Sequence, residues 1–518
     1  MNTTEFLTIA TAICPDKTAI VFEGKRYSFS QLNERVNRLA NVLLKLGVQK
    51  GDRVAMLQVN TNQCVEVYFA VAKIGAIYVP LNFRAKGNEL VYMLNSSEAG
   101  TLFIGERYID LVNSIKPETA SVKNFISLDG KQDGMLYYED MIESAPDDEV
   151  FTDIGDDDTT ILMYTAGTTG FPKGVMLSHN SFSIYVLENV SPPDPLTEER
   201  NILTVPLYHV AGIQAMMAAI YGGRTLLMER QFEAKEWMRL VAEEKANRAM
   251  MVPTMLKQLM DHPEFSRYDL SSLRVITYGA APMPLEVIKK AVELFPGVSF
   301  INAFGQTETA STITTLSPED HNITGTEEEK EKKLRRLSSI GRPMSDIEMK
   351  IIDEDGKDLP PGEVGEIVAR GPRVMSGYWK DQEKTEKTID KEGWVHTGDI
   401  GYMDEDGYFF LAGRATDIII RAGENISPEE VEAVLHSHPK VDEAAVIGIP
   451  DEEWGEVPMA VVVIKAGEEA TAEELMEHCR ANLASFKRPR SVVFADELPR
   501  NPMGKVLKRL LREQYAEG

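Results

Sequence analysis

A segment rich in glycine and hydroxyl groups, residues 164–175, carries the strongest chemical signal in the 518-residue chain. It reads Tyr-Thr-Ala-Gly-Thr-Thr-Gly-Phe-Pro-Lys-Gly-Val and follows an apolar run, 161–164, that predicts a strand. Glycines allow a backbone to approach a ligand, N–H and O–H groups donate to phosphate oxygens, and Lys173 supplies a positive charge. A Walker A loop is excluded, because Pro172 stands where that pattern needs glycine and Gly174 where it needs Ser or Thr. The segment predicts a phosphate-binding loop, with an ordinary surface turn as the alternative.

Five further short motifs follow this loop, at 278–282, 302–309, 397–399, 413–414 and 501–506. They read Tyr-Gly-Ala-Ala-Pro, Asn-Ala-Phe-Gly-Gln-Thr-Glu-Thr, Thr-Gly-Asp, Gly-Arg and Asn-Pro-Met-Gly-Lys-Val. Together with the loop, they resemble the motifs of the adenylate-forming superfamily, which comprises acyl-CoA synthetases, nonribosomal-peptide adenylation domains and beetle luciferases. The motifs extend from Tyr164 to Lys505, and the region before them fits the superfamily's N-terminal subdomain. The resemblance therefore covers essentially the whole chain.

The resemblance implies a binding site for ATP and AMP that draws on all of these motifs. Its residues are Thr165, Ala166, Gly167, Thr168, Thr169, Gly170, Lys173, Gly279, Ala280, Ala281, Asn302, Ala303, Phe304, Gly305, Gln306, Thr307, Asp399, Arg414 and Lys505. The resemblance also implies that Lys505, Glu308, Thr307 and His209 act in catalysis. A magnesium ion is implied at Glu308 and Thr165.

These implied roles suit the chemistry of the side chains. ATP carries several negative charges, and joining its α-phosphate to a carboxylate brings two anions together, so cations and donors must meet the developing charge. Asp399 can accept both ribose hydroxyls with help from Arg414, and Lys505 can reach carboxylate and α-phosphate oxygens. Phe304 offers a flat face for adenine, and Glu308 is a hard oxygen ligand suited to Mg²⁺. Without the resemblance, each residue has an ordinary alternative: Lys505 as a surface lysine, Phe304 as a core aromatic residue and Glu308 as a solvated glutamate.

The acyl pocket is expected around His209, which the resemblance implies gates or positions the carboxylate; a structural histidine is the alternative. The pocket residues are His209, Ala211, Ile213, Gln214, Ala280 and Ala303. Amino-acid adenylation domains usually place an Asp just after this histidine, whereas residues 210–213 offer no carboxylate. An uncharged medium-chain, cyclic or aromatic carboxylic acid is therefore expected. His179 is predicted to be structural, capping the helix that follows the phosphate loop.

Residues 413–426 resemble the hinge of the superfamily, although Thr stands where most members carry Asp or Lys. The resemblance implies that the C-terminal domain rotates here after adenylation, withdraws Lys505 and presents a loop beside the CoA tunnel. One site can then run two reactions without water reaching the activated acyl group. The implied hinge and CoA-binding residues are Thr416, Arg421, Ala422 and Gly423.

The resemblance implies an AMP-forming acid–CoA ligase. A carboxylate and ATP give acyl-AMP and pyrophosphate, and CoA then gives acyl-CoA and AMP, so ATP, Mg²⁺ and CoA are the expected small molecules. No carrier domain is fused at either end, which favours free CoA; an acyl-AMP ligase that loads a separate carrier protein is the alternative. The alternative from another functional class is a regulator that binds a nucleotide or an acyl group without catalysis. The presence of Lys505, Glu308 and Asp399 argues against this alternative. Luciferases carry out the same adenylation half-reaction, so luciferase chemistry stays open as a further alternative.

The secondary-structure elements that position these residues begin with an alternation of helix and strand in the first third of the chain. A helical period runs from Ser30 to Leu46, and an apolar strand, a helix and a second strand follow at 54–59, 63–74 and 76–81. This order is the signature of a parallel sheet. Short strand-like runs recur at 201–205, 225–228, 275–278 and 298–303.

The last hundred residues have a different pattern. Ser427 precedes a proline and has Glu three residues later, which is a capping box, and Thr471 begins a similar pattern. Apolar runs at 444–449 and 459–464 predict strands between these two helix starts.

The expected fold is α/β. A large N-terminal AMP- and acyl-binding body, 1–412, has several subdomains with mixed and parallel sheets flanked by helices. A small mobile α+β cap, 413–518, carries the catalytic lysine. The length agrees with about three folding units at roughly 150 residues each.

Composition limits the class of protein. The chain has 55 Lys and Arg against 81 Asp and Glu, and the formal charge of −26 argues against a nucleic-acid-binding or lipid-binding surface. The three cysteines have no CxxC spacing, so neither a disulfide framework nor a zinc ribbon is expected. We expect the protein to work in a reducing compartment. No signal-peptide pattern opens the chain and no apolar run reaches the roughly 18 residues of a membrane span, so the cytoplasm is expected. A homodimer is common among similar enzymes, and the oligomeric state stays open.

Overall fold

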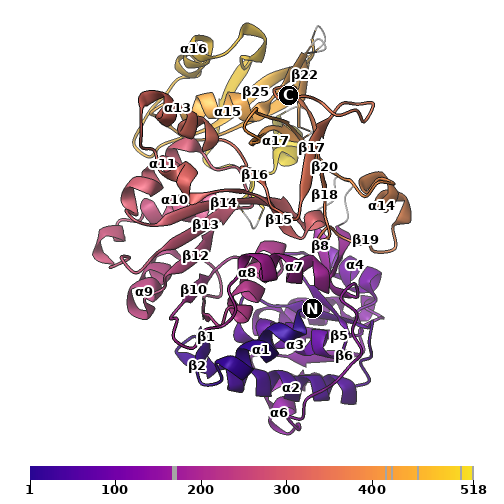
Figure 1. Cartoon of the computed structure of the whole chain (residues 1–518). Coiled ribbons are helices and arrows are strands. Elements are labelled where there is room, and N and C mark those ends of the chain that lie inside the picture. Colours follow the sequence, from indigo (N-terminus) through magenta and orange to yellow (C-terminus); the bar gives the residue numbers. More distant parts are fainter. Residues whose placement is uncertain (166–171, 415–416, 422–423, 452–453, 502–503, 516–518) are drawn as a thin grey trace.

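The computed structural model describes residues 1–165, 172–414, 417–421, 424–451, 454–501 and 504–515. Three sheets with their helices are built from the chain as far as Arg414, and a fourth sheet lies beyond it. Figure 1 shows the N-terminal elements at the bottom of the molecule and the C-terminal sheet at the top. This mixed architecture confirms the expected α/β fold class.

An eight-stranded sheet carries the two ends of the predicted phosphate loop. Its order is β19 (Gly377–Tyr378), β9 (Lys173–Ser178), β8 (Thr159–Thr165), β4 (Ile77–Pro80), β3 (Arg53–Leu57), β5 (Thr101–Ile104), β6 (Asn124–Ser127) and β7 (Leu136–Tyr137). β3 and β4 are parallel and joined by α3 (Asn62–Lys73), which confirms the predicted strand–helix–strand unit. β8 and β9 pair antiparallel with Thr165 opposite Lys173, so the pairing fixes both ends of the loop.

A nine-stranded sheet brings two more motifs together. Its order is β16 (Arg342–Pro343), β15 (Ser311–Leu316), β14 (Ser299–Gln306), β13 (Val275–Gly279), β12 (Arg248–Met251), β10 (Arg200–Leu203), β11 (Thr225–Met228), β1 (Thr18–Phe22) and β2 (Lys25–Ser28). Four of these strands confirm the runs expected between 201 and 303. β13 and β14 are parallel neighbours with Tyr278 opposite Asn302, so their motifs lie side by side at the carboxyl ends of the two strands.

Helices cover the faces of these sheets (Figure 1). They are α1 (Thr4–Ile13), α2 (Phe29–Lys45), α3, α4 (Gly87–Ser97), α5 (Ile109–Ile115), α6 (Tyr138–Glu143), α7 (His179–Asn189), α8 (Val210–Tyr221), α9 (Ala234–Glu244), α10 (Pro253–Met260), α11 (Leu285–Leu294), α12 (Pro318–His321), α13 (Glu327–Arg336) and α14 (Gln382–Thr388). The expected helical period is confirmed in α2, where Leu32, Val36, Leu39 and Leu43 are buried. Burying such an apolar stripe is the main favourable contribution of a helix to the core.

The predicted capping role of His179 is wrong. The N-cap of α7 is Ser178, whose hydroxyl accepts from the backbone N–H of Ser181, and His179 is the first residue of the helix. A serine hydroxyl reaches the orphan N–H groups of a first turn better than an imidazole does. His179 is structural in a different way, because its Nδ1 is buried and lies 2.8 Å from the hydroxyl of Thr3.

A four-stranded sheet carries the Thr-Gly-Asp and Gly-Arg motifs. Its order is β17 (Glu348–Ile352), β18 (Gly365–Arg370), β20 (Val395–Met403) and β21 (Phe409–Arg414). β20 and β21 form an antiparallel hairpin in which Asp399 lies opposite Arg414. Both motifs therefore lie at the same end of one hairpin.

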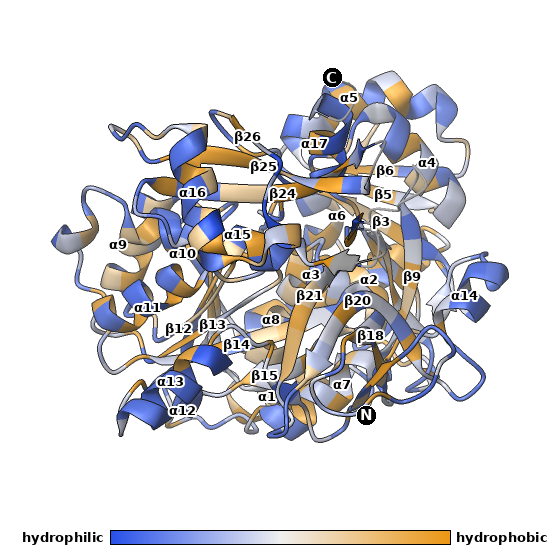
Figure 2. Cartoon of the chain, turned by 90° about the horizontal axis from the view of Figure 1, so that it is seen from above, coloured by the Kyte–Doolittle hydropathy of each residue, from blue (hydrophilic) through white to orange (hydrophobic). Residues whose placement is uncertain are grey.

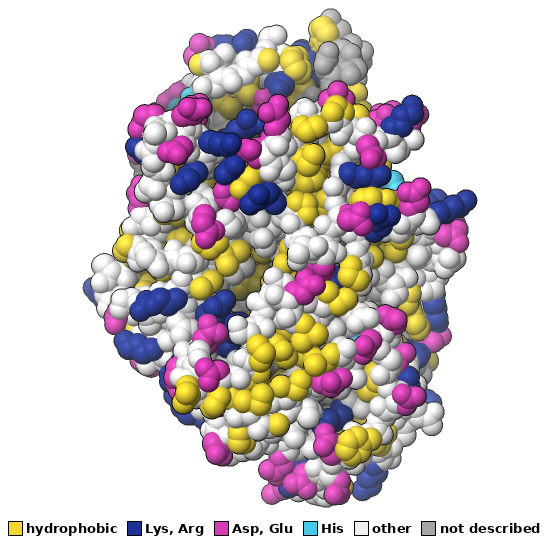
Figure 3. Space-filling view, in the orientation of Figure 1, with side chains coloured by type: hydrophobic (Ala, Val, Ile, Leu, Met, Phe, Trp, Pro, Cys, Tyr) yellow, Lys and Arg dark blue, Asp and Glu magenta, His cyan; other side chains and the backbone are white. Residues whose placement is uncertain are grey.

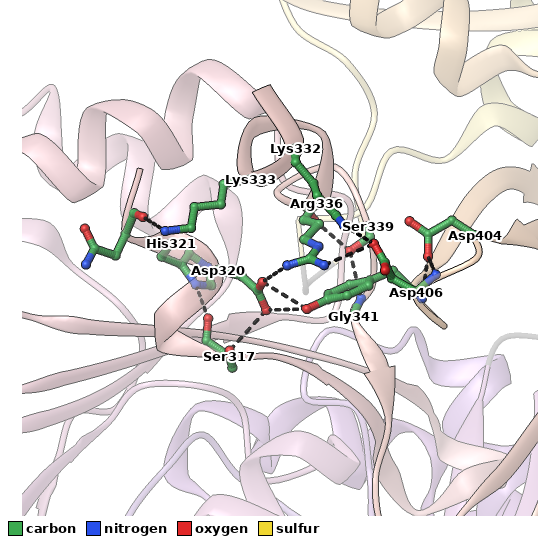
Figure 4. A network of polar contacts seen from close by, with 12 residues as sticks. Ser317, Asp320, His321, Lys332, Lys333, Arg336, Ser339, Gly341, Asp404 and Asp406 are labelled. Atoms are coloured by element: carbon green, nitrogen blue, oxygen red, sulfur yellow. Dashed lines mark hydrogen bonds and ion pairs between the residues drawn. The ribbon is translucent and has the colours of Figure 1, made fainter. Parts of the chain in front are cut away.

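The other end of this hairpin is anchored by a buried polar network around Asp320 of α12 (Figure 4). The Tyr408 hydroxyl donates to both carboxylate oxygens of Asp320, at 2.9 and 3.1 Å. Arg336 of α13 donates to Asp320 at 3.2 Å and also to Asp406 at 3.2 Å. The network ties the hairpin turn to two helices of the N-terminal body.

The C-terminal residues form a separate sheet with the order β23 (Glu424–Ile426), β22 (Ile419–Arg421), β25 (Gly455–Ile464) and β24 (Val441–Asp451), and β26 (Ser491–Phe494) pairs with β25. Three helices accompany it: α15 (Pro428–His436), α16 (Ala472–Asn482) and α17 (Lys508–Tyr515). The hydroxyls of Ser427 and Thr471 accept from the backbone N–H groups three residues on, both at 3.2 Å, which confirms the two predicted helix starts. Figure 2 shows β24 and β25 as largely apolar strands beside helices with hydrophilic faces.

Charges of both signs are mixed on the molecular surface. On the face in Figure 3, Lys and Arg side chains lie among Asp and Glu side chains rather than forming a single positive field. Among the described helices, none is long and apolar enough to cross a membrane.

Candidate active site

Two glycines let the site strands pack as closely as they do. A Cβ on Gly305 would lie 1.4 Å from the carbonyl oxygen of Ser311, and a Cβ on Gly279 would lie 2.0 Å from that of Ala303. Both approaches are to backbone atoms, so no side chain could move aside to make room. Because these two positions lack a side chain, the ends of β13, β14 and β15 can lie close together. The 3₁₀ turn η4 (Thr307–Thr309) follows at the end of β14.

The predicted ribose-binding residues do come together. Arg414 Nε lies 2.7 Å from Asp399 Oδ1, and Gln306 Nε2 donates to Asp399 Oδ2 at 2.6 Å. Arg414 Nη1 and Gln306 Nε2 also donate to the carbonyl oxygen of Thr397, at 2.7 and 2.9 Å. Burial raises the pKa of Asp399, although Arg414, the nearby Lys505 and Gln306 oppose this rise. The arrangement presents a buried carboxylate whose two oxygens are each held in place, as a bidentate acceptor for a diol requires.

Lys505 lies beside this carboxylate although more than 100 residues separate them in the sequence. Burial lowers the pKa of Lys505 and the charge of Arg414 lowers it further, while Asp399, Asp417 and Glu429 favour the charged form. The backbone N–H of Lys505 donates to the Asn501 side chain at 2.9 Å, which fixes the start of the turn.

The segment that carries Lys505 packs against the N-terminal body. A Cβ on Gly504, the residue before it, would lie 2.5 Å from Thr254 Oγ1 on α10. The structure thus brings the predicted catalytic Lys505, from the segment between β26 and α17, near the predicted ribose-binding residues of the β20–β21 hairpin.

The phosphate end of the site holds residues that the motifs did not single out. Lys173 of β9 and Lys384 of α14 each place Nζ 5.7 Å from the ring centre of Tyr378. The Tyr378 hydroxyl donates to Glu308 Oε1 at 2.9 Å. Burial, and then the positive charge of Lys384, lower the pKa of Lys173 to about 8. The sequence offered no local signal for Tyr378 or Lys384, because they reach the site through the pairing of β19 with β9 across some two hundred residues.

The chemical types of the two predicted donors, the Glu308 carboxylate and the Thr165 hydroxyl, suit a metal ion shared with a phosphate ligand. Among the described residues, no group of three or more His, Cys, Asp and Glu side chains gathers to hold a metal. One carboxylate and the Thr165 hydroxyl of β8 would leave most coordination positions to phosphate oxygens and water, which is the usual way proteins hold Mg²⁺.

His209 stands at the N-cap position of α8 and its ring is neutral. Burial lowers the pKa of His209 to about 4, and no hydrogen-bond partner of its buried Nδ1 is found among the described residues. Gln214 Nε2, one turn along α8, is also buried without a partner there, although its Oε1 accepts from Thr312 at 3.4 Å. Each of these two buried polar atoms has unmet hydrogen-bonding capacity that a bound ligand could satisfy.

The apolar residues predicted to line the acyl pocket are only partly brought together. Ala211 and the half-buried Ala280 pack in the core beside β12 and β13, whereas Ile213 packs in the core between the first two sheets. Ala280 also has a left-handed backbone with φ +66°. Phe304 is half-buried against Ile340 and Ile313, so part of its ring belongs to the core.

Arg421 of the C-terminal sheet forms part of a group of aromatic and basic residues. Its guanidinium lies 5.1 Å from the ring centre of Trp454 and donates to the carbonyl oxygen of Phe486 at 2.9 Å. Lys487 lies over the Phe486 ring at 5.6 Å. Of this group, the motifs indicated Arg421 and not the aromatic residues, which come from distant segments that only the folded sheet brings close.

Several predicted site residues lie outside the described residues. They are Ala166, Gly167, Thr168, Thr169, Gly170, Thr416, Ala422 and Gly423.

Two surface clefts lie away from the predicted site. A cleft of about 480 Å³ is lined by Asp320, Arg342 and Phe409 near the turn of the β20–β21 hairpin, and one of about 730 Å³ lies on the C-terminal sheet beside Lys440 and Phe494. Neither is lined by a residue of the motifs. The site is therefore assigned by its converging side chains and not by the size of a hollow.

Comparison with known proteins agrees with this geometry. Residues 8–379 match the family model described as AMP-binding enzyme, and residues 430–505 match the model of the AMP-binding enzyme C-terminal domain. The chain belongs to the AMP-binding enzyme family. The resemblance to the adenylate-forming superfamily expected from the motifs is confirmed.

Relatives of this AMP-binding enzyme are similar along its whole length. A feruloyl-CoA synthase of Amycolatopsis sp is 34% identical, with 97% of this chain and 96% of the relative covered. The fatty acid–[acyl-carrier-protein] ligase ScoC of Streptomyces coeruleorubidus is 33% identical, with 97% and 94% covered. The crystal structure of the anthranilate CoA ligase AuaEII in complex with anthranoyl-AMP has a TM-score of 0.90 at 27% identity and covers 99% of this chain and 97% of that one.

Proposed function

We propose that this enzyme is an ATP-dependent acid–CoA ligase that forms acyl-AMP as its intermediate. The observation that carries the proposal is the buried Asp399 carboxylate held by Arg414 and Gln306, within the electrostatic reach of Lys505, in a chain that belongs to the AMP-binding enzyme family. A lysine from the C-terminal segment near the proposed ribose-binding carboxylate is placed where a cation is needed to join a carboxylate to an α-phosphate.

In the first step, a carboxylate oxygen attacks the α-phosphorus of ATP. A C–O–P link forms, the bond between the α-phosphorus and the bridging oxygen breaks, and pyrophosphate leaves with the electron pair. Asp399 accepts the ribose hydroxyls, Arg414 holds Asp399, and the Lys505 ammonium neutralises the two anions that approach each other. His209, neutral because its pKa is about 4, can position the acid without adding a charge.

In the second step, the CoA sulfur attacks the acyl carbonyl carbon and a C–S bond forms. The bond between that carbon and the phosphate oxygen breaks, AMP leaves with the electron pair, and the thiol proton passes to solvent. The division into a body, 1–412, and a cap, 413–518, together with rotation near Thr416, would withdraw Lys505 and admit the thiol. Arg421 with Trp454 and Phe486 offers flat faces and positive charge suited to the adenine and phosphates of CoA.

Glu308 and Thr165 are the residues that would hold Mg²⁺, which neutralises phosphate charge when bound. Tyr378 orients Glu308 by donating to its Oε1 at 2.9 Å.

The substrate we propose is an uncharged medium-chain, cyclic or aromatic carboxylic acid. Residues 210–213 carry no charge, and Gln214 is the polar exception beside His209. The similar proteins include a feruloyl-CoA synthase, a fatty acid–[acyl-carrier-protein] ligase and an anthranilate CoA ligase, which supports a pocket of this kind.

Free CoA is the proposed acceptor, and a carrier protein is the alternative because ScoC, one of the relatives, is a carrier-protein ligase.

The proposed location is the cytoplasm, because all three cysteines are free and buried, as in a reducing compartment.

The test is an assay of the purified enzyme with ATP, Mg²⁺, free CoA and a library of uncharged carboxylic acids. We expect thioesters of free CoA and equal amounts of AMP and pyrophosphate. Accumulation of acyl-AMP without thioester would favour carrier loading. An absence of pyrophosphate release with every acid would contradict the proposed function and favour a regulator.

A further inference from the structure

Two ammonium groups converge at the phosphate end of the site, one more than the motifs account for. Lys173 approaches from β9 and Lys384 from α14, and both stand 5.7 Å from the centre of the Tyr378 ring. The Tyr378 hydroxyl is bonded to Glu308, so Lys384 shares a common neighbour with both the phosphate-loop lysine and the candidate metal-binding carboxylate.

Neither ammonium group has a carboxylate within 4.0 Å in the part of the chain that the structure describes. The two other lysines next to Lys384 in the sequence are paired: Lys380 with Glu98 at 2.5 Å, and Lys387 with Glu383 at 2.6 Å. Glu308 and Asp381 favour the charged form of Lys173, but burial and the neighbouring Lys384 outweigh them. Two cations therefore stand next to each other in a chain of net charge −26. Such a pair costs free energy unless an anion binds between them.

The position of Lys384 is set by the first turn of α14. The Thr385 hydroxyl accepts from the backbone N–H of Tyr378 at 2.9 Å and donates to the carbonyl oxygen of Asp381 at 2.8 Å. The Asp381 carboxylate caps the helix by accepting from the N–H of Lys384 at 3.1 Å. These bonds hold the helix start against β19, so Lys384 faces the site while Lys387, one turn later, is exposed.

We propose that Lys384 joins Lys173 in binding the β- and γ-phosphates of ATP, which become the leaving pyrophosphate. This inference rests on the proposed function and adds a binding residue to it. When the bond between the α-phosphorus and the bridging oxygen breaks, the electron pair stays on that oxygen. The two ammonium groups stabilise the charge that gathers on pyrophosphate, and no proton needs to move.

The experiment compares Lys384→Ala with the matched change Lys387→Ala on the same helix. Steady-state kinetics give KM for ATP, the inhibition constants of inorganic pyrophosphate and of AMP, and the rate of thioester formation from supplied acyl-AMP. For Lys384→Ala we expect KM for ATP and the inhibition constant of pyrophosphate to rise about tenfold, the effect of losing one charge-assisted contact. AMP inhibition and thioester formation should stay within about twofold of the parent. Lys384→Arg should restore most of the pyrophosphate affinity, and Lys387→Ala should behave as the parent.

Unchanged pyrophosphate inhibition in Lys384→Ala would overturn the inference. Equal weakening of AMP and pyrophosphate would also overturn it, because the residue would then act on the shape of the whole site. Direct calorimetry of inorganic pyrophosphate binding to the parent and to Lys384→Ala separates this inference from the proposed function. If no acid supports pyrophosphate release, the ligase proposal fails, and a difference in pyrophosphate binding still decides the role of Lys384.

Discussion

At the scale of single residues, Lys505 is the side chain on which the proposed first step depends. It is the cation placed beside Asp399 from the C-terminal side, and nothing in the proposed second step uses it. Lys505→Ala should slow acid-dependent ATP–pyrophosphate exchange by roughly 10²–10³, the usual effect of losing a positioned charge. Thioester formation from supplied acyl-AMP should change little.

The matched control for this change is Arg509→Ala, because Arg509 is exposed on α17 four residues further on. It should leave both half-reactions unaffected. Equal loss of both half-reactions in Lys505→Ala would contradict the division of labour.

His179 predicts a pH dependence of stability. Burial lowers its pKa to about 4, although Asp158 and Asp156 favour the charged form, and the ordinary value is 6.5. The unfolded chain therefore binds more protons between these values, so the free energy of unfolding falls as the pH drops from about 6.5 towards 4, by up to about 3 kcal/mol from this residue.

His179→Gln keeps an acceptor for Thr3 but cannot take up a proton. Urea unfolding at pH 7 and pH 5 should show a smaller difference between the two pH values for the variant than for the parent. An identical difference in both would show that His179 does not contribute to the acid sensitivity.

At the scale of elements, the network around Asp320 predicts how firmly the β20–β21 hairpin is held. Asp320→Asn keeps the shape of the buried side chain but removes its charge, while Tyr408 and Arg336 remain as donors. The free energy of unfolding should fall by about 1–3 kcal/mol, measured by chemical denaturation. Asp406→Asn is the control, because Asp406 is at the same 3.2 Å from Arg336 but is solvent-exposed, and it should cost under about 1 kcal/mol. Equal costs for the two changes would contradict the account of the network.

Local patterns in the sequence were sufficient where the interaction is itself local. The helix starts at Ser427 and Thr471 were predictable because a hydroxyl and an N–H three residues on are neighbours in any helix. The same logic was wrong at His179, since Ser178, one residue earlier, is the better cap. The residues 54–81 were predictable as strand, helix and strand from periodicity alone.

Contacts between distant segments could not be predicted in this way. Tyr378 reaches Glu308 because β19 pairs with β9, and no pattern near residue 378 indicates that pairing. Trp454 and Phe486 approach Arg421 only after the C-terminal sheet has formed. The motifs located the ends of the strands that carry the site, but the side chains contributed by other elements required the fold.

At the scale of the whole molecule, a contact between Lys257 of α10 and Asp442 of β24, at 2.8 Å, joins the N-terminal body to the C-terminal sheet in the arrangement that holds Lys505 at the site. If this arrangement serves the first step only, Lys257→Ala should slow adenylation about two- to fivefold, as expected for a half-buried ion pair worth up to about 1 kcal/mol. The thioester-forming half-reaction should not change.

Lys290→Ala provides the control, because Lys290 pairs with Asp261 within the body, at 2.6 Å, and does not reach the C-terminal sheet. Rapid-quench measurement of each half-reaction in the two variants checks the expectation. Equal slowing of both half-reactions by Lys257→Ala would show that the contact supports the fold and not one step.

The central claim is that the acid attacks the α-phosphate and that CoA then displaces AMP. Turnover with an acid labelled with ¹⁸O in both carboxylate oxygens tests it most directly, by mass spectrometry of the nucleotide product. Because the attacking oxygen stays on phosphorus when the thiol cleaves the acyl bond, each AMP should carry one labelled oxygen. Unlabelled AMP, or label in pyrophosphate, would contradict it.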